Sequence, residues 1–267
     1  LDKIKSYFLV IIIGGLLITI LLISIIYFSN NFWIHFWIFM SLFTVFINLF
    51  YTSLILPIFN KLKPLEDGSL KDKIYNYAKS VKFPLSNIFV IDGSKRSSKA
   101  NAFFSGLGKS KKIVLYDTLI KNYSDEELVS VLAHEVGHYK KKHIVSNLIL
   151  SILFTGFMLF VLSKFLFNSE ISFALGGDVS FRHFELFAFS ILYSPISFIL
   201  GIFMNIKSRI NEYEADNYAV KTFDKTHLIS ALKNLSKDNL VNLTPNPVYV
   251  FVNYSHPTLH QRIKAMT

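Results

Sequence analysis

Four uninterrupted apolar stretches constrain the fold of this chain more than any other feature of its sequence. Each is longer than the roughly 20 residues that a helix needs to cross a bilayer, and they cover about residues 7–28, 32–58, 145–167 and 183–203. Of the 267 residues, 52% are hydrophobic and only 17% are charged, a balance that soluble globular domains seldom reach. The sequence therefore predicts a mainly α-helical, multi-pass membrane protein.

The order of these stretches predicts how the chain is organised. Two transmembrane hairpins alternate with two polar segments, so the predicted divisions are 1–58, 59–144, 145–203 and 204–267. If every stretch spans, both polar segments lie on one side of the bilayer. All but two of the 28 Lys and Arg residues lie on that side as well, which the positive-inside rule assigns to the cytoplasm. The same bias explains the net charge of +10 without a nucleic-acid partner.

The polar segment between the hairpins is typical of a small mixed α/β unit. A stripe of apolar residues predicts a helix over 69–81, and short β-branched or aromatic runs predict strands over 87–92 and 112–116. The chain has no cysteine, so any metal that it binds must be held by histidines and carboxylates.

A capping box marks the start of a second helix in this unit. Ser124 and Glu127 have the spacing at which each side chain can bond the backbone amide of the other residue. We therefore expect a helix that begins here and runs to about Lys142.

This capped helix contains the sequence His134-Glu135-Val136-Gly137-His138. Residues four apart lie one above the other on a helix, so the two imidazoles can bind a single Zn²⁺, and Glu135 can reach a water on that metal. The spacing is that of zinc metalloproteases. The alternative is two surface histidines on an amphipathic helix, but the strong cap and the apolar stripe of the same helix favour the metal.

A catalytic zinc of this kind needs a third protein ligand, and the acidic run after the fourth apolar stretch supplies candidates. Glu212 and Asp216 share a face of a helix, whereas Glu214 points elsewhere. We assign Glu212 as the third ligand and Asp216 as the carboxylate that hydrogen-bonds the free ring nitrogen of a ligand histidine. A solvated acidic face is the alternative.

A third group of polar residues ends the chain. His256 and Arg262 could donate hydrogen bonds to the oxyanion that forms when a peptide carbonyl is attacked. Pro257 is expected at the first position of a short helix. Spacing alone does not separate this catalytic role from that of a terminal helix with ordinary surface cations.

With these residues in place, the chain resembles type I CAAX prenyl endopeptidases, the multi-span zinc proteases that remove the last three residues of prenylated proteins. The resemblance covers nearly the whole chain. Its motifs occur in the family's order, namely the run 56–62, the run 93–106, the run 112–119, the two-histidine motif, the segment 208–216 and the segment 254–262.

The resemblance implies one Zn²⁺ per chain, held by His134, His138 and Glu212, and a catalytic centre lined by His256 and Arg262. It also implies a wall against which the substrate peptide lies as an added strand. The residues of that wall are Asn101, Ala102, Phe103 and Phe104.

We expect hydrolysis of a peptide bond by zinc-activated water, with Glu135 as the general base that passes the proton to the leaving amine. Asp216, His256 and Arg262 complete the expected catalytic set. The resemblance implies that the substrates are the C-termini of prenylated proteins in a lipid bilayer. It implies the endoplasmic reticulum, or the nuclear envelope, with the zinc site facing the cytoplasm.

Members of the family typically have seven spans, and this chain holds what resemble the last four, so we expect a fragment or a shortened homologue. Two other functions stay open. A membrane quality-control protease of the heat-shock type shares the zinc motif and a four-span layout, and it would cleave unprenylated chains equally well. An inactive truncated homologue would bind zinc without peptidase activity.

Overall fold

The computed structural model describes residues 2–95, 102–105 and 111–267. The chain divides into two compact units, of which one comprises Leu1–Ile47 and Val145–Leu200 and the other Asn48–Ile144 and Gly201–Thr267. Most of the described residues are helical, which confirms the predicted fold class.

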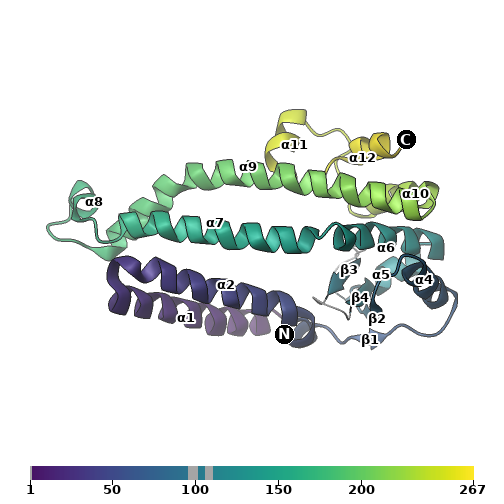
Figure 1. Ribbon diagram of the computed structural model, residues 1–267, viewed down its shortest axis with the longest axis horizontal. Coiled ribbons are helices and arrows are strands. Elements are labelled where there is room, and N and C mark those ends of the chain that lie inside the picture. Colours follow the sequence, from purple (N-terminus) through teal and green to yellow (C-terminus); the bar gives the residue numbers. More distant parts are fainter. Residues whose placement is uncertain (1, 96–101, 106–110) are drawn as a thin grey trace. The chain divides into compact units, whose positions relative to one another are not determined.

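The first unit consists of long apolar helices (Figure 1). Its elements are α1 (Asp2–Phe28), the 3-10 turn η1 (Ser29–Asn31), α2 (Phe32–Phe50), α7 (His143–Phe165), α8 (Ser169–Ala174) and the beginning of α9 (Arg182–Thr222). By length and composition, three helical stretches of the described residues could cross a membrane, and these are Asp2–Phe59, His143–Phe165 and Arg182–Thr222. The first contains both α1 and α2, which meet at η1, where Ser29 has a left-handed φ of 46°. The four predicted spans thus correspond to α1, α2, α7 and the first half of α9.

Close packing holds α2 against α7 in this unit. The indole N–H of Trp37 donates to the backbone carbonyl of Ile152 at 2.8 Å. Gly156 makes room for that ring, because a Cβ at this position would lie 2.8 Å from the indole. The buried apolar residues of the interface are Phe32, Phe36, Leu159, Leu162 and Leu166.

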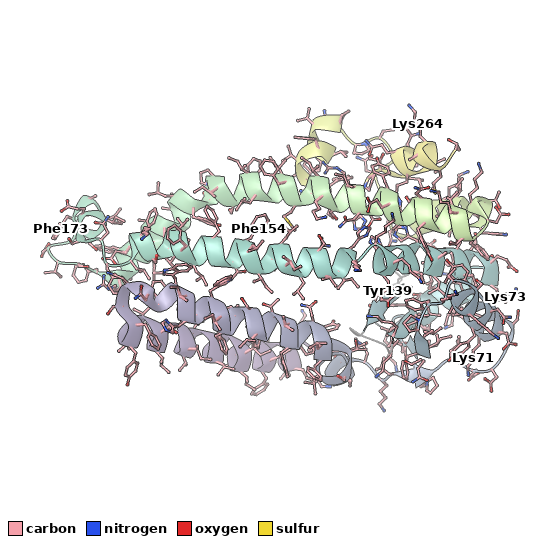
Figure 2. The ribbon with its side chains drawn as sticks, viewed as in Figure 1. Lys71, Lys73, Tyr139, Phe154, Phe173 and Lys264 are labelled. Atoms are coloured by element: carbon pink, nitrogen blue, oxygen red, sulfur yellow. The ribbon has the colours of Figure 1, made fainter. Side chains whose placement is uncertain are left out.

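Large apolar side chains cover the outer faces of the same helices. Ile11 on α1 and Leu42 on α2 are each 67% exposed, and Phe187 on α9 is 58% exposed. α4 (Ser69–Ser80) of the second unit carries Lys71 and Lys73 instead (Figure 2). Soluble proteins rarely expose apolar surface on this scale, so these faces are suited to contact with lipid.

A four-stranded sheet forms one layer of the second unit. Its strands are β1 (Lys63–Pro64), β2 (Leu85–Ile91), β3 (Ala102–Ser105) and β4 (Lys111–Tyr116), in the spatial order β1-β2-β4-β3. β2 and β4 are parallel, and the outer strands run antiparallel to their neighbours. The predicted strands over 87–92 and 112–116 are confirmed as β2 and β4. β1 and β3 were not predicted as strands from residue patterns, because two and four residues are too short to show an alternation.

Helices form the other layers of the second unit. They are α3 (Leu56–Phe59), which follows the π-helical segment η2 (Tyr51–Ile55), then α4, α5 (Asp117–Asn122), α6 (Asp125–Lys140), the end of α9, α10 (Lys225–Asp238), α11 (Pro247–Asn253) and α12 (Leu259–Met266). α4 confirms the helix expected over 69–81. In the buried core, Leu132 and Val136 of α6 lie with Ile113 of the sheet and Leu228 of α10. α6 is therefore a central element, between the sheet and α10.

The predicted capping box begins α6. The amide of Glu127 donates to Ser124 Oγ at 3.3 Å, and the amide of Ser124 donates to Glu127 Oε2 at 3.0 Å. The other oxygen of the Glu127 carboxylate accepts from Ser230 at 2.6 Å and from Asn234 at 2.9 Å. Burial alone would raise the pKa of Glu127, but these hydrogen bonds outweigh it and hold the pKa below its usual value. The cap thereby also joins α6 to α10.

Candidate metal centre

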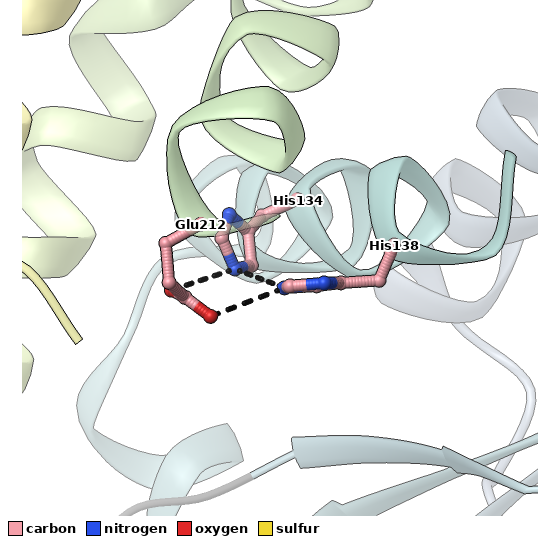
Figure 3. Close-up of side chains that lie close together, drawn as sticks. All are labelled: His134, His138 and Glu212. Carbon is pink, nitrogen blue, oxygen red and sulfur yellow. Dashed lines mark hydrogen bonds and ion pairs between the residues drawn. The ribbon is translucent and has the colours of Figure 1, made fainter. Parts of the chain in front are cut away.

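Two neighbouring helices bring the three predicted ligands together (Figure 3). His134 and His138 lie on α6, and their Nε2 atoms are 3.1 Å apart. Glu212 comes from α9, with Oε2 at 3.5 Å from His134 Nε2 and Oε1 at 3.3 Å from His138 Nε2. Glu212 is only 4% exposed, so its charge is held away from bulk water.

The spacing of these atoms fits a divalent ion with tetrahedral ligands. Ligand atoms at the usual 2.0–2.2 Å from a tetrahedral Zn²⁺ lie about 3.3–3.6 Å from one another. The two Nε2 atoms are 3.1 Å apart, and each has a different oxygen of Glu212 at 3.3 or 3.5 Å. With one atom taken from each residue, the three atoms lie within 4.8 Å of one another, so they can share one ion. Two imidazoles and one carboxylate also form a known set of ligands for catalytic zinc, one that leaves a fourth position open.

A close approach of two helices sets these distances. Gly137 of α6 faces Ala215 of α9, and a Cβ at Gly137 would lie 2.8 Å from Ala215 Cα and 2.9 Å from its carbonyl oxygen. Ala215 is fully buried. Because both contacts are with backbone atoms, a side chain at Gly137 can be accommodated only if α6 and α9 move apart.

Replacing Gly137 by alanine is therefore expected to destabilise the fold and weaken metal binding. Helix propensity favours alanine by about 0.5–1 kcal/mol, but overpacking of this kind typically costs about 1–3 kcal/mol. The thermal melting temperature and the zinc affinity of the G137A variant should both fall. The matched control is Gly201→Ala in α9, where a Cβ meets open space and neither quantity should fall. An unchanged zinc affinity in G137A would contradict this account of the spacing.

Asp216 hydrogen-bonds the second nitrogen of His134. Its Oδ1 lies 2.8 Å from His134 Nδ1, and Asp216 is 1% exposed. Arg262 of α12 donates to both oxygens of the same carboxylate, at 2.6 and 2.8 Å, and its Nη1 atom lies 3.4 Å from Glu212. Burial disfavours the charged imidazole, but the hydrogen bonds to Asp216 and Glu212 outweigh this effect and raise the pKa of His134 to about 9. The carboxylates thus strongly favour a positive charge at this position.

The remaining predicted catalytic residues line a pocket of about 440 Å³ beside the ligands. Glu135 lies in its wall together with His134 and His138, and burial raises the pKa of its carboxyl above the usual value. His256 also lines the pocket, and its Nδ1 lies 3.1 Å from Glu212 Oε2. Its side chain is 65% exposed, so a molecule in the pocket can reach the ring. The structure thus brings both residues to the group of ligands, and their catalytic roles stay predictions.

The predicted peptide-binding wall falls partly within the described residues. Asn101 lies outside them. Ala102, Phe103 and Phe104 belong to β3, which pairs only with β4 in the part of the chain that the structure describes. β3 is thus the outer strand of the described sheet on the side of β4, the position at which an added strand would pair. Ala102 lines the pocket beside the ligands, whereas Phe103 packs against the apolar residues on the sheet.

Two features near the site differ from the expectations or were missed. Pro257 was expected at the first position of a short helix, but this is wrong, because α12 starts two residues later, at Leu259. Thr258 and Gln261 form a capping box that determines this start. His143, whose Nδ1 lies 2.9 Å from His138 Nδ1, has no role in any of the predictions from the sequence. No motif covers His143, because it follows the end of α6.

Together, the helical membrane unit and the helix-borne group of two histidines and a glutamate define a membrane protein with a candidate metalloprotease site. Comparison with known families agrees, because peptidase family M48 matches residues 64–267 and the CAAX prenyl protease N-terminal family, described as five membrane helices, matches residues 1–61. The chain belongs to peptidase family M48 and is an integral membrane protein. Membership of this family implies a metal.

Known proteins match the chain over nearly its whole length. It is 38% identical to CAAX prenyl protease 1 of Saccharomyces cerevisiae over 282 residues, which cover 99% of this chain and 62% of the yeast protein. It is 37% identical to the CAAX prenyl protease 1 homolog of Arabidopsis thaliana, with 99% of this chain and 63% of that protein covered. The crystal structure of S. mikatae Ste24p matches with a TM-score of 0.92 at 37% identity, over 99% of this chain and 65% of that one. These matches confirm the resemblance found in the sequence, and the chain spans less than two thirds of each relative.

Proposed function

We propose that this chain is a zinc-dependent membrane endopeptidase that removes the last three residues from prenylated CAAX proteins. The observation that carries the proposal is the group of His134, His138 and Glu212, in which one ligand atom from each residue lies within 4.8 Å of the others, beside a pocket of about 440 Å³. The printed names of the yeast and Arabidopsis relatives support the substrate class.

The proposed mechanism assigns one task to each residue around the pocket. When bound, Zn²⁺ lowers the pKa of water and polarises the scissile carbonyl. Glu135 accepts the proton of the attacking water and passes it to the leaving amine. His256, which lines the same pocket, donates to the oxyanion of the tetrahedral intermediate. Asp216 and Arg262 are positioning residues in this scheme, because Arg262 holds Asp216, which in turn holds His134.

The surroundings of the pocket are suited to a lipid-anchored peptide. β3 is an outer strand of the described sheet, where an extended peptide would pair as an added strand, and aliphatic side chains in the pocket wall can receive apolar residues of the peptide. These side chains are Leu119, Val131, Leu228, Leu232 and Leu235. The prenyl group would partition into the bilayer. We propose the endoplasmic reticulum membrane as the location, with the metal centre on the cytoplasmic side as the distribution of Lys and Arg indicates.

The experiment that tests this function compares a farnesylated CAAX peptide with its unprenylated twin. The detergent-purified chain is incubated with each peptide, with and without a zinc chelator, and release of the last three residues is measured. We expect release from the farnesylated peptide alone, and we expect the chelator to abolish it.

Each other result points to one of the alternatives. Equal cleavage of both peptides would identify a quality-control protease of broad specificity. Absence of cleavage by a chain that holds one zinc ion would mean that these residues do not suffice for peptidase activity. Cleavage that the chelator does not affect would contradict the metal mechanism.

A further inference from the structure

We propose that His143 and Glu214 form a positioning pair that fixes the ring of the ligand His138 for metal binding. The inference rests on the proposed metal site, to which it adds two residues that none of the predicted roles includes. It concerns the second nitrogen of His138, on the side of the ring that faces away from the candidate metal position.

Three side chains form a continuous row of contacts at this place. His138 Nδ1 lies 2.9 Å from His143 Nδ1, and His143 Nε2 lies 2.9 Å from Glu214 Oε2. The side chain of His143 is 5% exposed, whereas that of Glu214 is 47% exposed. The row thus runs from the candidate metal position to the surface.

The end of α6 makes this row possible. α6 ends at Lys140, and Lys142 adopts a left-handed φ of 59° before α7 begins at His143. This turn brings His143 back against His138, with the two ring centroids 5.0 Å apart. Glu214 lies on α9, so the row connects the same two helices that carry the metal ligands.

Only one arrangement of protons satisfies every contact in the row when a metal is bound. His138 must offer a lone pair at Nε2, so its proton lies on Nδ1. That N–H donates to His143 Nδ1, which therefore carries a lone pair, and the proton of His143 lies on Nε2. This second N–H donates to the Glu214 carboxylate. The carboxylate thus selects the tautomer of His143, and His143 selects the tautomer of His138.

The arrangement parallels the one at the other ligand histidine. His134 Nδ1 lies 2.8 Å from the buried Asp216, a carboxylate in direct contact. His138 reaches a carboxylate through an intervening imidazole instead. Outer partners of this kind orient the ring and make it a better ligand, and their loss typically lowers metal affinity by about 10–100-fold.

The test measures zinc affinity by competition with a chromophoric chelator, using the full chain in detergent. His143→Leu removes the acceptor for His138 Nδ1, and we expect its zinc affinity to fall by about 10–100-fold. His143→Asn places an amide oxygen where His143 Nδ1 lies, so its affinity should remain within a factor of about three of the wild-type value, well short of that loss. His227→Leu in α10 is the matched control and should leave the affinity unchanged.

A second pair of variants keeps the inference testable if the His143→Leu substitution prevents folding. Glu214→Leu, at a half-exposed position, should weaken zinc binding severalfold, whereas Glu214→Gln keeps an oxygen that accepts from His143 and should not. The absorption spectrum of the Co²⁺-loaded chain should change in the leucine variants alone, because it reports ligand geometry.

Two results would overturn the inference by itself. Equal zinc affinities for the leucine variants and the wild type would show that the row does not support His138. An asparagine variant as weak as the leucine variant would show that the bulk of the imidazole matters rather than its acceptor. A wild-type chain that binds no zinc would instead overturn the proposed function, and the inference with it.

Discussion

Replacing Glu135 by glutamine is expected to lower the rate of peptide cleavage by about 10²–10⁴-fold, the usual contribution of a general base. Glutamine has the same shape as glutamate but cannot accept the proton of the attacking water. Glu135 lines the pocket without belonging to the group of three ligands, so zinc should remain bound at one ion per chain. The measurements are the single-turnover rate on the farnesylated peptide and the zinc content of the purified variant.

Glu126→Gln is the matched control for this substitution, because Glu126 lies on the same helix but pairs with Lys73 at the surface. Its cleavage rate should equal that of the wild type. Full activity of the Glu135 variant would rule out the mechanism proposed here. Loss of zinc from that variant would mean that Glu135 is a metal ligand rather than the general base.

The same chemical change at Glu212 should have the opposite effect on the metal. An amide oxygen is a much weaker ligand than a carboxylate, so E212Q should bind zinc at least about 10²-fold more weakly, beyond the loss typical of an outer partner. Cleavage should disappear together with the metal. Because Arg262 keeps Asp216 as its partner, the fold should survive the loss of this charge.

Zinc content after dialysis against a weak chelator separates the two variants. We expect E135Q to keep its zinc without activity and E212Q to lose both, with similar melting temperatures for the metal-free forms. Retention of zinc by E212Q at wild-type affinity would remove Glu212 from the ligand set.

Local patterns in the sequence predict a large part of this fold. The apolar stretches predict the long helices, and the capping box at Ser124 predicts the start of α6 because both depend on neighbours within a few residues. The pairing of His134 with His138 is predictable for the same reason, since the helical period alone places them on one face. The helical period also predicts that Glu212 and Asp216 share one face of their helix. No local pattern shows that this face packs against α6.

Features that depend on distant segments escape such reasoning. Glu214 was expected to point away from the ligands, and it does, but its partner His143 depends on a left-handed turn at Lys142 that no residue preference indicates. The sequence does not predict that α6 and α9 cross at Gly137. A glycine within a helix lowers the stability of that helix, but it does not show which neighbouring segment requires the small residue. A four-residue strand such as β3 is stabilised by its partner β4 rather than by its own composition.

The unbroken course of α9 has a consequence for the geometry of the substrate. The apolar stretch of this helix ends near residue 203, and Glu212 follows nine residues later in the same 41-residue helix. At 1.5 Å per residue, the backbone of Glu212 lies about 14 Å along the helix axis beyond the end of the apolar stretch. An extended peptide covers that distance with about four residues. A substrate of the proposed class, with its lipid in the bilayer, would have to span this length, so we expect the length of its anchor to decide whether its scissile bond reaches the metal.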